Sequence, residues 1–451
     1  MASSLTAPTL GGHLLLGNMR ALQREPLRFY FRVTSQFGHM VRVRAFPGIY
    51  LYQVTHPKDI ERVLVTNQHN YRKPDVFVTP VSKLAGKGIL TSDGELWLHQ
   101  RRLMQPAFHR SKLAALSQVM AESAQTAAER WGSFASKNAT IDVADEMMRL
   151  TLKIVSVALF STDISADADR LGHAVRETFE YVSFLMNHAF SLPESVPTRR
   201  NLRFKHSRRL LDEMVFSLIN ERRQTGEDKA DLLSMLLAAR DEDTGEGMSD
   251  QQLRDEVMTL ILAGHETTGA ALSWTWYLLS QNPEPRSRLQ AELDQVLNGR
   301  SPAPEDLERL PFTRMVFAET MRLYPPAWGL PREAIGDDTL GDYRVPAHSL
   351  VNLSQWVTHR HPDFWEKPDE FDPERFTPER SEGRPRFAYF PFGGGARQCI
   401  GNNFALMEAQ LAIATLAQRF TLDLVPGHPV EPDPTFTLRP RHGLMMTIKE
   451  R

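Results

Sequence analysis

Cys399 is the only cysteine of this 451-residue chain, and it lies in the run FGGGARQCIG at positions 392–401. A single cysteine excludes an intrachain disulfide, and it excludes a zinc or iron–sulfur site built from several cysteines of this chain. The thiol can therefore be a buried core group, a nucleophile or one soft ligand to a single metal ion.

The residues around Cys399 favour the metal ligand. The glycines of the run let the backbone approach a bound group closely. Residues 402–411 have the apolar spacing of a helix, so the thiol lies at a helix N-terminus, and Arg397 stands two positions before it. We expect both features to lower the pKa of the thiol and to favour the thiolate.

An acid and an alcohol stand side by side in the motif AGHETT at positions 263–268. Apolar spacing predicts that the motif lies inside one long helix over residues 250–281. The small residues of the motif share one face, which suits either a flat bound group or a close crossing with another helix. Glu266 and Thr267 are the two components of a short proton relay.

Two further pairs have helical spacing. Glu319 and Arg322 usually would form a surface ion pair, but apolar neighbours on both sides indicate burial. Trp97 and Arg101 form either an aromatic–cation pair or a half-buried tryptophan beside a solvated arginine. Arg332 has no local signature and by itself reads as a loop arginine.

The apolar spacing along the chain predicts a mainly α protein with a small β part (α+β). Alternation over residues 40–45 and 49–54, around Pro47-Gly48, indicates a hairpin. Residues 225–249 read as a surface loop. We expect a single domain over residues 1–451, with 1–30 as an N-terminal lead-in. The predicted helices are 112–131, 144–160, 204–223, 250–281, 284–298, 312–323 and 402–420.

Charge and hydropathy exclude two classes of protein. The net charge of −2 and the pI of about 6.8 leave no bulk positive field for nucleic acid. The longest apolar stretch, around residues 257–264, is far shorter than the roughly 20 residues that span a bilayer. We expect a soluble, cytoplasmic protein without a membrane anchor.

Together these motifs closely resemble those of the cytochrome P-450 family of haem-thiolate monooxygenases, from about residue 30 to the end of the chain. The run FGGGARQCIG resembles the haem-binding loop, and AGHETT resembles the oxygen-activating helix motif. Trp97 and Arg101 resemble the helix that reaches a haem propionate. Glu319 and Arg322, with Arg375 of PERF at 373–376, resemble the family's buried glutamate–arginine–arginine cluster.

The resemblance implies the cytochrome P-450 fold, with haem b (iron protoporphyrin IX) between the long central helix and the helix after the cysteine loop. It implies that Cys399 is the proximal iron ligand, whose negative charge favours O–O cleavage. Glu266 and Thr267 would supply protons for oxygen activation. The implied structural cluster is Glu319, Arg322 and Arg375. The other implied cofactor-binding residues are Trp97, Arg101, Ala263, Arg332, Phe392, Gly393, Arg397 and Gly401.

The resemblance also implies where a substrate would lie, over the distal face of the haem. The side chains expected there are apolar, which indicates a lipophilic substrate such as a fatty acid, terpenoid or polyketide. Each of them can equally be plain core. The candidates are Phe77, Leu84, Phe184, Ala263, Ala327, Trp328, Phe436 and Leu438.

The implied reaction inserts one oxygen atom of O2 into the substrate by hydroxylation or epoxidation. Because we expect no fused reductase domain, the electrons would come from a separate ferredoxin or flavodoxin system with its reductase. The basic residues Arg101, Arg102, Arg110 and Lys112 suit an acidic partner. The alternatives are a haem-thiolate peroxygenase or isomerase, and a non-catalytic haem-binding protein. The Glu266–Thr267 pair argues against both.

Overall fold

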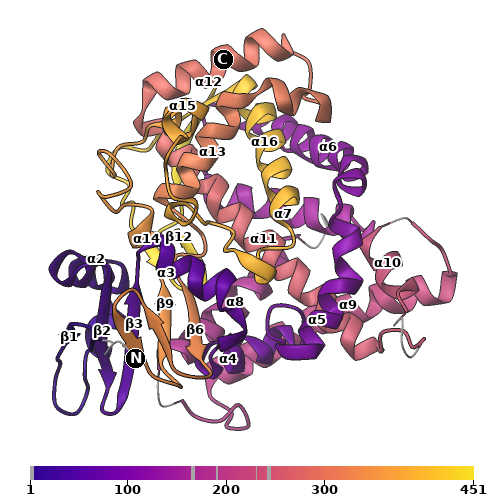
Figure 1. Ribbon diagram of the computed structural model, residues 1–451. Coiled ribbons are helices and arrows are strands. Elements are labelled where there is room, and N and C mark those ends of the chain that lie inside the picture. Colours follow the sequence, from indigo (N-terminus) through magenta and orange to yellow (C-terminus); the bar gives the residue numbers. More distant parts are fainter. Residues whose placement is uncertain (1–4, 164–167, 189–190, 230, 241–244) are drawn as a thin grey trace. The chain divides into compact units, whose positions relative to one another are not determined.

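The computed structural model describes residues 5–163, 168–188, 191–229, 231–240 and 245–451. Helices dominate these residues and several small sheets accompany them (Figure 1). The prediction of a mainly α protein with a small β part is therefore confirmed.

The helices differ widely in length, and α11 is the longest. They are α1 (Met19–Arg24), α2 (Pro26–Phe37), α3 (Pro57–Glu61), α4 (Asp75–Ala85), α5 (Gly94–Met104), α6 (Arg110–Ala135), α7 (Val143–Phe160), α8 (Ala168–Asn187), α9 (Arg199–Thr225), α10 (Leu232–Ala238), α11 (Asp250–Gln281), α12 (Pro283–Leu297), α13 (Pro311–Leu323), α14 (Gln355–Thr358), α15 (Pro378–Ser381) and α16 (Asn402–Arg419). The strands are β1 (Thr9–Leu10), β2 (Met40–Phe46), β3 (Ile49–Val54), β4 (Tyr71–Arg72), β5 (Thr140–Asp142), β6 (Leu330–Ala334), β7 (Asp338–Leu340), β8 (Tyr343–Val345), β9 (Leu350–Leu353), β10 (Phe420–Leu424), β11 (Pro432–Pro434), β12 (Leu438–Pro440) and β13 (Met445–Glu450).

Each predicted helix is present, and α11 has the predicted bounds because Ser249 caps it by accepting a hydrogen bond from the Gln252 amide at 3.2 Å. The prediction of a loop over residues 225–249 is wrong in part, because α10 lies within it. Asp231 caps α10 and forms a buried ion pair with Arg222 at 2.7 Å. The apolar run of α10 is too short to give a periodic signal. Helices α2, α4 and α8, and the short helices α1, α3, α14 and α15, were not predicted.

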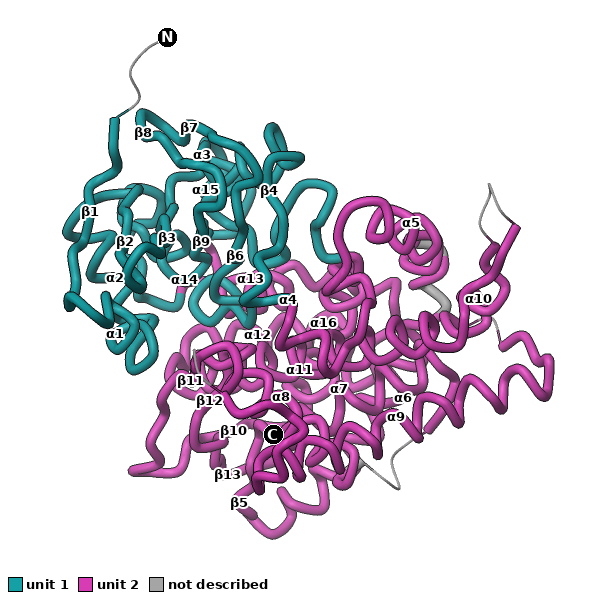
Figure 2. Tube along the Cα trace, turned by 90° about the horizontal axis from the view of Figure 1, so that it is seen from below, with its two compact units in different colours: residues 1–78, 321–371, 375–399 teal, residues 79–320, 372–374, 400–451 magenta. Residues whose placement is uncertain are grey.

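The chain divides into two compact units, each assembled from separated segments (Figure 2). Unit 1 contains Met1–Val78, Met321–Phe371 and Arg375–Cys399, and unit 2 contains Thr79–Thr320, Asp372–Glu374 and Ile400–Arg451. The boundaries interrupt helices α4 and α13. The single haem domain expected over residues 1–451 stays a prediction.

Unit 1 is built on a six-stranded sheet with the order β1-β2-β3-β9-β6-β4. The predicted hairpin β2–β3 is present, and Arg42 pairs with Tyr52 in its antiparallel register. Strand β3 also pairs in parallel with β9, where Leu51 lies opposite Leu350. Strand β6, which carries Arg332, is antiparallel to β9. The sheet therefore brings the first and the last third of the chain together in one unit.

Unit 2 has α11 at its centre, with α7 packed along it (Figure 1). The two helices approach closely at Gly264, where a Cβ atom would lie 2.7 Å from Val155 Cγ2 of α7. Thr151 Oγ1 of α7 donates a hydrogen bond to the His265 carbonyl of α11 at 2.9 Å. Gly264 thus serves a close helix crossing, which was one of the two interpretations that the sequence left open.

The described residues include no helix that combines the length and the apolar composition needed to cross a bilayer.

Candidate functional site

The run around Cys399 is a tight loop whose glycines are required by their surroundings. Gly393 and Gly395 have φ angles of +70° and +67°, a region that L side chains rarely adopt. A Cβ atom on Gly395 would lie 1.8 Å from the Leu64 carbonyl oxygen. The Cys399 amide donates to the Phe392 carbonyl at 3.0 Å, and the residue itself is exposed. Cys399 is therefore not a core residue.

The helix predicted after the cysteine is α16, which begins at Asn402 with Gly401 as its N-cap. A Cβ atom added to Gly401 would lie 3.8 Å from Phe108 Cε1, which is an ordinary van der Waals contact. The placement of Cys399 just before a helix N-terminus is confirmed.

His359, which the sequence analysis missed, holds the start of the cysteine loop. Its Nε2 accepts a hydrogen bond from the Phe390 amide at 3.0 Å, and the Phe390 carbonyl accepts from the Gly393 amide at 2.9 Å. Burial, with Arg322 and Arg360 nearby, lowers the pKa of His359 well below its usual value, so the ring is a neutral acceptor. No spacing signal marks His359, because its partner is 31 residues away.

The predicted glutamate–arginine–arginine residues are buried, which excludes an ordinary surface ion pair. Arg322 is 0% exposed and donates to the carbonyls of His359, Pro368 and Glu370 at 2.8, 2.6 and 3.1 Å. Arg375 donates to the Lys367 carbonyl at 2.8 Å. These guanidinium groups satisfy backbone carbonyls of an irregular segment that has no regular hydrogen-bond ladder.

Glu319 is also 0% exposed, and its Oε1 accepts a hydrogen bond from the Asp372 amide at 2.9 Å. Its carboxylate therefore fixes a backbone group of the same irregular segment. The cluster's structural role stays a prediction, which is tested below through Arg322.

The face of α11 that carries Ala263 and Thr267 is open. From Leu253 to Leu279 nearly every residue is buried, yet Ala263 is exposed and Thr267 is half-buried. Thr267 Oγ1 donates to the Ala263 carbonyl at 2.7 Å, one turn back in the helix. Both side chains are small, so a flat molecule can approach the helix backbone there.

Glu266 points elsewhere. It is 4% exposed, and its Oε1 accepts a hydrogen bond from Thr437 Oγ1 at 2.8 Å and lies 3.9 Å from Arg439 Nη1. Burial raises the pKa of Glu266, while Arg439 and Thr437 offset part of that effect. Among the described residues no hydrogen bond joins Glu266 to Thr267, so the relay stays a prediction.

Thr437 and Arg439 are partners of Glu266 that the sequence analysis did not identify. They alternate with Phe436 and Leu438, which were predicted pocket residues. Alternation places Thr437 and Arg439 on the opposite side of an extended segment from Phe436 and Leu438. This alternation was the one signal in the sequence that could have pointed to Thr437 and Arg439. It does not identify Glu266 as their partner, because that requires knowing which helix packs against the segment.

The predicted propionate-binding residues are distributed over both units. Trp97 and Arg101 are half-buried and lie one turn apart on α5 in unit 2. Arg332 on β6 is 9% exposed and donates to the Pro331 carbonyl at 2.8 Å, and Arg397 is half-buried in the cysteine loop. Their joint role around one haem stays a prediction.

The predicted pocket residues of unit 2 are apolar and mostly covered. Leu84 and Leu438 are 2% and 0% exposed, so both belong to the core. Phe436 stacks on Phe179 with ring centroids 5.0 Å apart. Phe184 is half-buried and lies against the His188 ring at 4.1 Å. Ala263, on the open face of α11, is the exposed member of the set.

The predicted pocket residues of unit 1 are half-buried. Trp328 packs with Tyr30 of α2 at a centroid distance of 6.3 Å, inside a small apolar cluster. This packing supports the plain-core interpretation of Trp328. Phe77 and Ala327 are half-buried as well. A pocket role for any of them stays a prediction.

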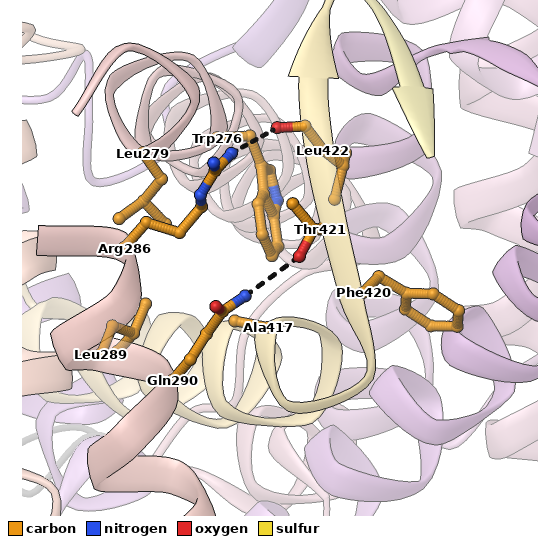
Figure 3. A pocket seen from close by; sticks show the side chains of 9 residues that line it. All are labelled: Trp276, Leu279, Arg286, Leu289, Gln290, Ala417, Phe420, Thr421 and Leu422. Atoms are coloured by element: carbon orange, nitrogen blue, oxygen red, sulfur yellow. Dashed lines mark hydrogen bonds between the residues drawn. The ribbon is translucent and has the colours of Figure 1, made fainter. Parts of the chain in front are cut away.

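A small pocket in unit 2 contains none of the predicted site residues. It lies where α11, α12, α16 and β10 meet, and Arg286 and Gln290 of α12 donate there to the Leu422 carbonyl at 3.4 Å and to Thr421 Oγ1 at 3.2 Å (Figure 3). The space inside is about that of one water molecule. It is too small for an organic substrate.

Residues 7–449 match the family Cytochrome P450. The chain belongs to this family. The cytochrome P450 described here is similar to a cyclooctat-9-en-7-ol 5-monooxygenase of Streptomyces melanosporofaciens, with 37% identity over 94% of this chain and 90% of the relative. It is also similar to a pentalenene oxygenase of Streptomyces avermitilis, with 35% identity over 95% of this chain and 93% of the relative.

The solved structures agree with the sequence relatives. The haem domain of cytochrome P450DA superposes with a TM-score of 0.89 and 29% identity, covering 99% of this chain and 98% of that one. The predicted cytochrome P-450 fold is therefore confirmed. This cytochrome P450 is a monooxygenase with a haem-thiolate cofactor, and its reaction requires O2, an organic substrate and a source of electrons.

The residues of this cytochrome P450 fit such a cofactor. The sequence offers one thiol, that of Cys399, and the residue is exposed in a loop with two glycines at positive φ. In unit 2 the small residues Ala263 and Thr267 leave part of an otherwise buried helix open, as a flat macrocycle requires. Arg332 and Arg397 in unit 1 are cations suited to carboxylates such as the haem propionates.

Glu408 of α16 is a buried acid that no prediction used. It is 0% exposed, and burial raises its pKa well above the usual value, an effect that the nearby Thr268 hydroxyl offsets in part. The folded protein thus holds a proton that the unfolded chain releases above its ordinary pKa of 4.5. Below pH 4.5 the carboxyl is protonated in both states, and it does not oppose folding. As the pH rises from there towards the folded pKa, the free energy of unfolding falls, because only the unfolded chain releases the proton.

We therefore expect Glu408→Gln to stabilise the protein increasingly as the pH rises. The difference in Tm between variant and wild type should grow from about pH 5 to about pH 8, as measured by thermal melts of the holoenzyme. The control is Glu305→Gln, because Glu305 is exposed. Parallel Tm curves for wild type and Glu408→Gln would contradict the prediction.

Proposed function

We propose that this cytochrome P450 holds iron protoporphyrin IX through Cys399 and inserts one oxygen atom of O2 into a lipophilic substrate by hydroxylation or epoxidation. The observation that supports this most directly is the exposed Cys399 in a loop where a Cβ atom on Gly394 or Gly395 would clash with its neighbours. A thiol that served only packing would be covered.

The bound haem would supply the redox chemistry that activates O2. The chain's own residues would set its environment. The Cys399 thiolate would donate electron density to the iron, and Arg332 and Arg397, with Trp97 and Arg101, would hold the propionates. Phe392, whose carbonyl accepts from the Cys399 amide, would limit water near the sulfur.

The protons would pass through Thr267 and Glu266. The Thr267 hydroxyl lies on the open face of α11, where it can turn from the Ala263 carbonyl to a bound partner. The raised pKa of Glu266 makes this carboxyl a better proton donor and acceptor near working pH than an exposed glutamate. Thr437 and Arg439 would position the Glu266 side chain.

The substrate would be mostly apolar. The predicted pocket side chains are aliphatic or aromatic. The names of the two relatives specify an alkene, pentalenene, and an alkenol, cyclooctat-9-en-7-ol. An unsaturated, largely hydrocarbon substrate agrees with both observations, and it would be held mainly by burial of its surface.

A ferredoxin or flavodoxin-type protein would deliver the electrons. Arg102 and Lys112 are exposed and Arg101 is half-buried, which suits an acidic partner. The side chain of Arg110, the other predicted docking residue, lies outside the described residues. The cytoplasmic location stays a prediction from the sequence.

The relay is tested with Thr267→Ala. Because this change removes the hydroxyl and leaves the helix intact, the variant should keep its haem but release peroxide, with product formed per electron falling roughly tenfold or more. Product, peroxide and consumed electrons are measured with O2, a reductase system and a lipophilic substrate identified by spectral binding.

The matched control for this test is Thr275→Ala, because Thr275 makes the same kind of bond to the Ala271 carbonyl, at 2.9 Å, on the buried part of α11. Tight coupling in Thr267→Ala would refute the relay. Wild-type turnover with peroxide but not with O2 and electrons would favour the peroxygenase alternative instead, and no turnover with either would favour a haem-binding protein.

A further inference from the structure

Two histidines and an aspartate of unit 1, none of them a predicted site residue, converge in space. His39 directly precedes β2, while His361 and Asp363 follow α14. One ligand atom from each of the three lies within 4.8 Å of the other two. None of them has a place in the reaction proposed above.

Both ring nitrogens of His39 contact polar groups of unit 1. Thr55 Oγ1 donates to the His39 carbonyl at 3.2 Å and lies 3.1 Å from His39 Nδ1. His39 Nε2 lies 2.9 Å from Asp363 Oδ2. In the tautomer with the proton on Nδ1, the Nε2 lone pair faces this carboxylate, and a cation bound between the two atoms would be held by both.

His361 brings a second ring nitrogen close to the same carboxylate. Its Nδ1 accepts from the Asp363 amide at 3.3 Å and lies 3.7 Å from Asp363 Oδ2. The rings of His39 and His361 are only 4.2 Å apart. Ring nitrogens of both histidines therefore lie close to the same carboxylate oxygen.

We propose that His39, His361 and Asp363 bind a divalent transition metal ion, with zinc as the best match, and that water completes a tetrahedral site. Zinc lies about 2.0–2.2 Å from nitrogen and oxygen ligands, which places the ligand atoms of a tetrahedron roughly 3.3–3.5 Å apart. The two measured separations, 2.9 and 3.7 Å, bracket this value. The Thr55 hydroxyl on His39 Nδ1 is the outer hydrogen bond that zinc-binding histidines usually have.

The surroundings permit an ion to enter and to be held. The side chain of Asp363 is 58% exposed, whereas those of His39 and His361 are 25% and 14% exposed. The Phe364 ring stacks on His39 at 5.5 Å and covers one side. The ion would join residues 324 positions apart in sequence, so it would stabilise unit 1 without taking part in catalysis.

The test measures zinc binding to the purified holoenzyme. Protein stripped with a chelator is titrated with zinc chloride alone, and bound zinc per chain is measured by equilibrium dialysis and elemental analysis. We expect one zinc ion per chain in the wild type and a rise in Tm on binding. In Asp363→Asn and His361→Ala the affinity should fall at least about tenfold, and the rise in Tm should disappear.

The controls are Glu431→Gln and His442→Ala. These residues form a histidine–carboxylate pair at 3.8 Å in unit 2 and are outside the three-residue group, so their loss should leave zinc binding unchanged. Asp363→Asn keeps the shape of an exposed side chain, so it should fold, and its Tm without zinc verifies this. A wild type that binds no zinc, or equal binding by Asp363→Asn and wild type, would overturn the proposal.

Discussion

Cys399→Ser should abolish the red-shifted absorption band that a reduced haem-thiolate protein shows with carbon monoxide. A serine hydroxyl is not ionised at neutral pH and is a much poorer electron donor to iron than a thiolate. The chain has no other cysteine that could replace the lost ligand. Monooxygenase turnover should fall below detection for the same reason, and the spectrum of the reduced protein with carbon monoxide is the primary measurement.

The control for this experiment is Ala396→Ser, which adds a hydroxyl to the same loop at an exposed position without touching the sulfur. It should keep the red-shifted band. A Cys399→Ser protein that binds haem and still shows that band would refute Cys399 as the iron ligand, and the proposed function would be wrong.

Arg322→Lys should destabilise the protein by about 3 kcal/mol or more, despite conserving the charge. The guanidinium donates to three backbone carbonyls and stacks on Trp365 at 5.0 Å, and a lysine ammonium cannot reproduce that planar fork. Because the His359 carbonyl is one acceptor and His359 holds Phe390 at the cysteine loop, haem retention should fall as well. Urea unfolding and the haem content of the purified protein measure the two effects.

Arg314→Lys is the matched control, because Arg314 lies on the same helix α13 but is exposed. It should change the free energy of unfolding by less than about 0.5 kcal/mol. If Arg322→Lys and Arg314→Lys unfold at the same urea concentration, the predicted structural role of the glutamate–arginine–arginine cluster is refuted.

The long periodic elements were predictable from local pattern. Helix α11 has the predicted bounds, because its cap and its apolar spacing are both encoded within the segment itself. The hairpin β2–β3 was predictable for the same reason. Helix α10 was not, because seven residues are too few for a period and its stability depends on burial and on the Arg222–Asp231 pair.

The candidate site divides in the same manner. Cys399 was identifiable from its glycines, and Glu266 and Thr267 from a motif in a helix. Their partners were not, because a hydrogen bond such as that of Glu266 with Thr437 spans 171 positions and leaves no mark in either segment. Glu266 and Thr267 are adjacent in sequence, but their side chains bond different partners: Glu266 bonds Thr437 and Thr267 bonds the Ala263 carbonyl.

The sequence alone determined the family of this protein, the place of its single cysteine in a glycine-rich loop and the helix that carries the acid and the alcohol, since these depend on residue type and local spacing. Tertiary structure decided what each group contacts. It assigned Gly264 to the crossing with Val155, placed His359 between Arg322 and Phe390, and brought His39 to Asp363. The physical reason is that burial and close contact arise from packing distant segments, and no local pattern encodes which distant segment will arrive.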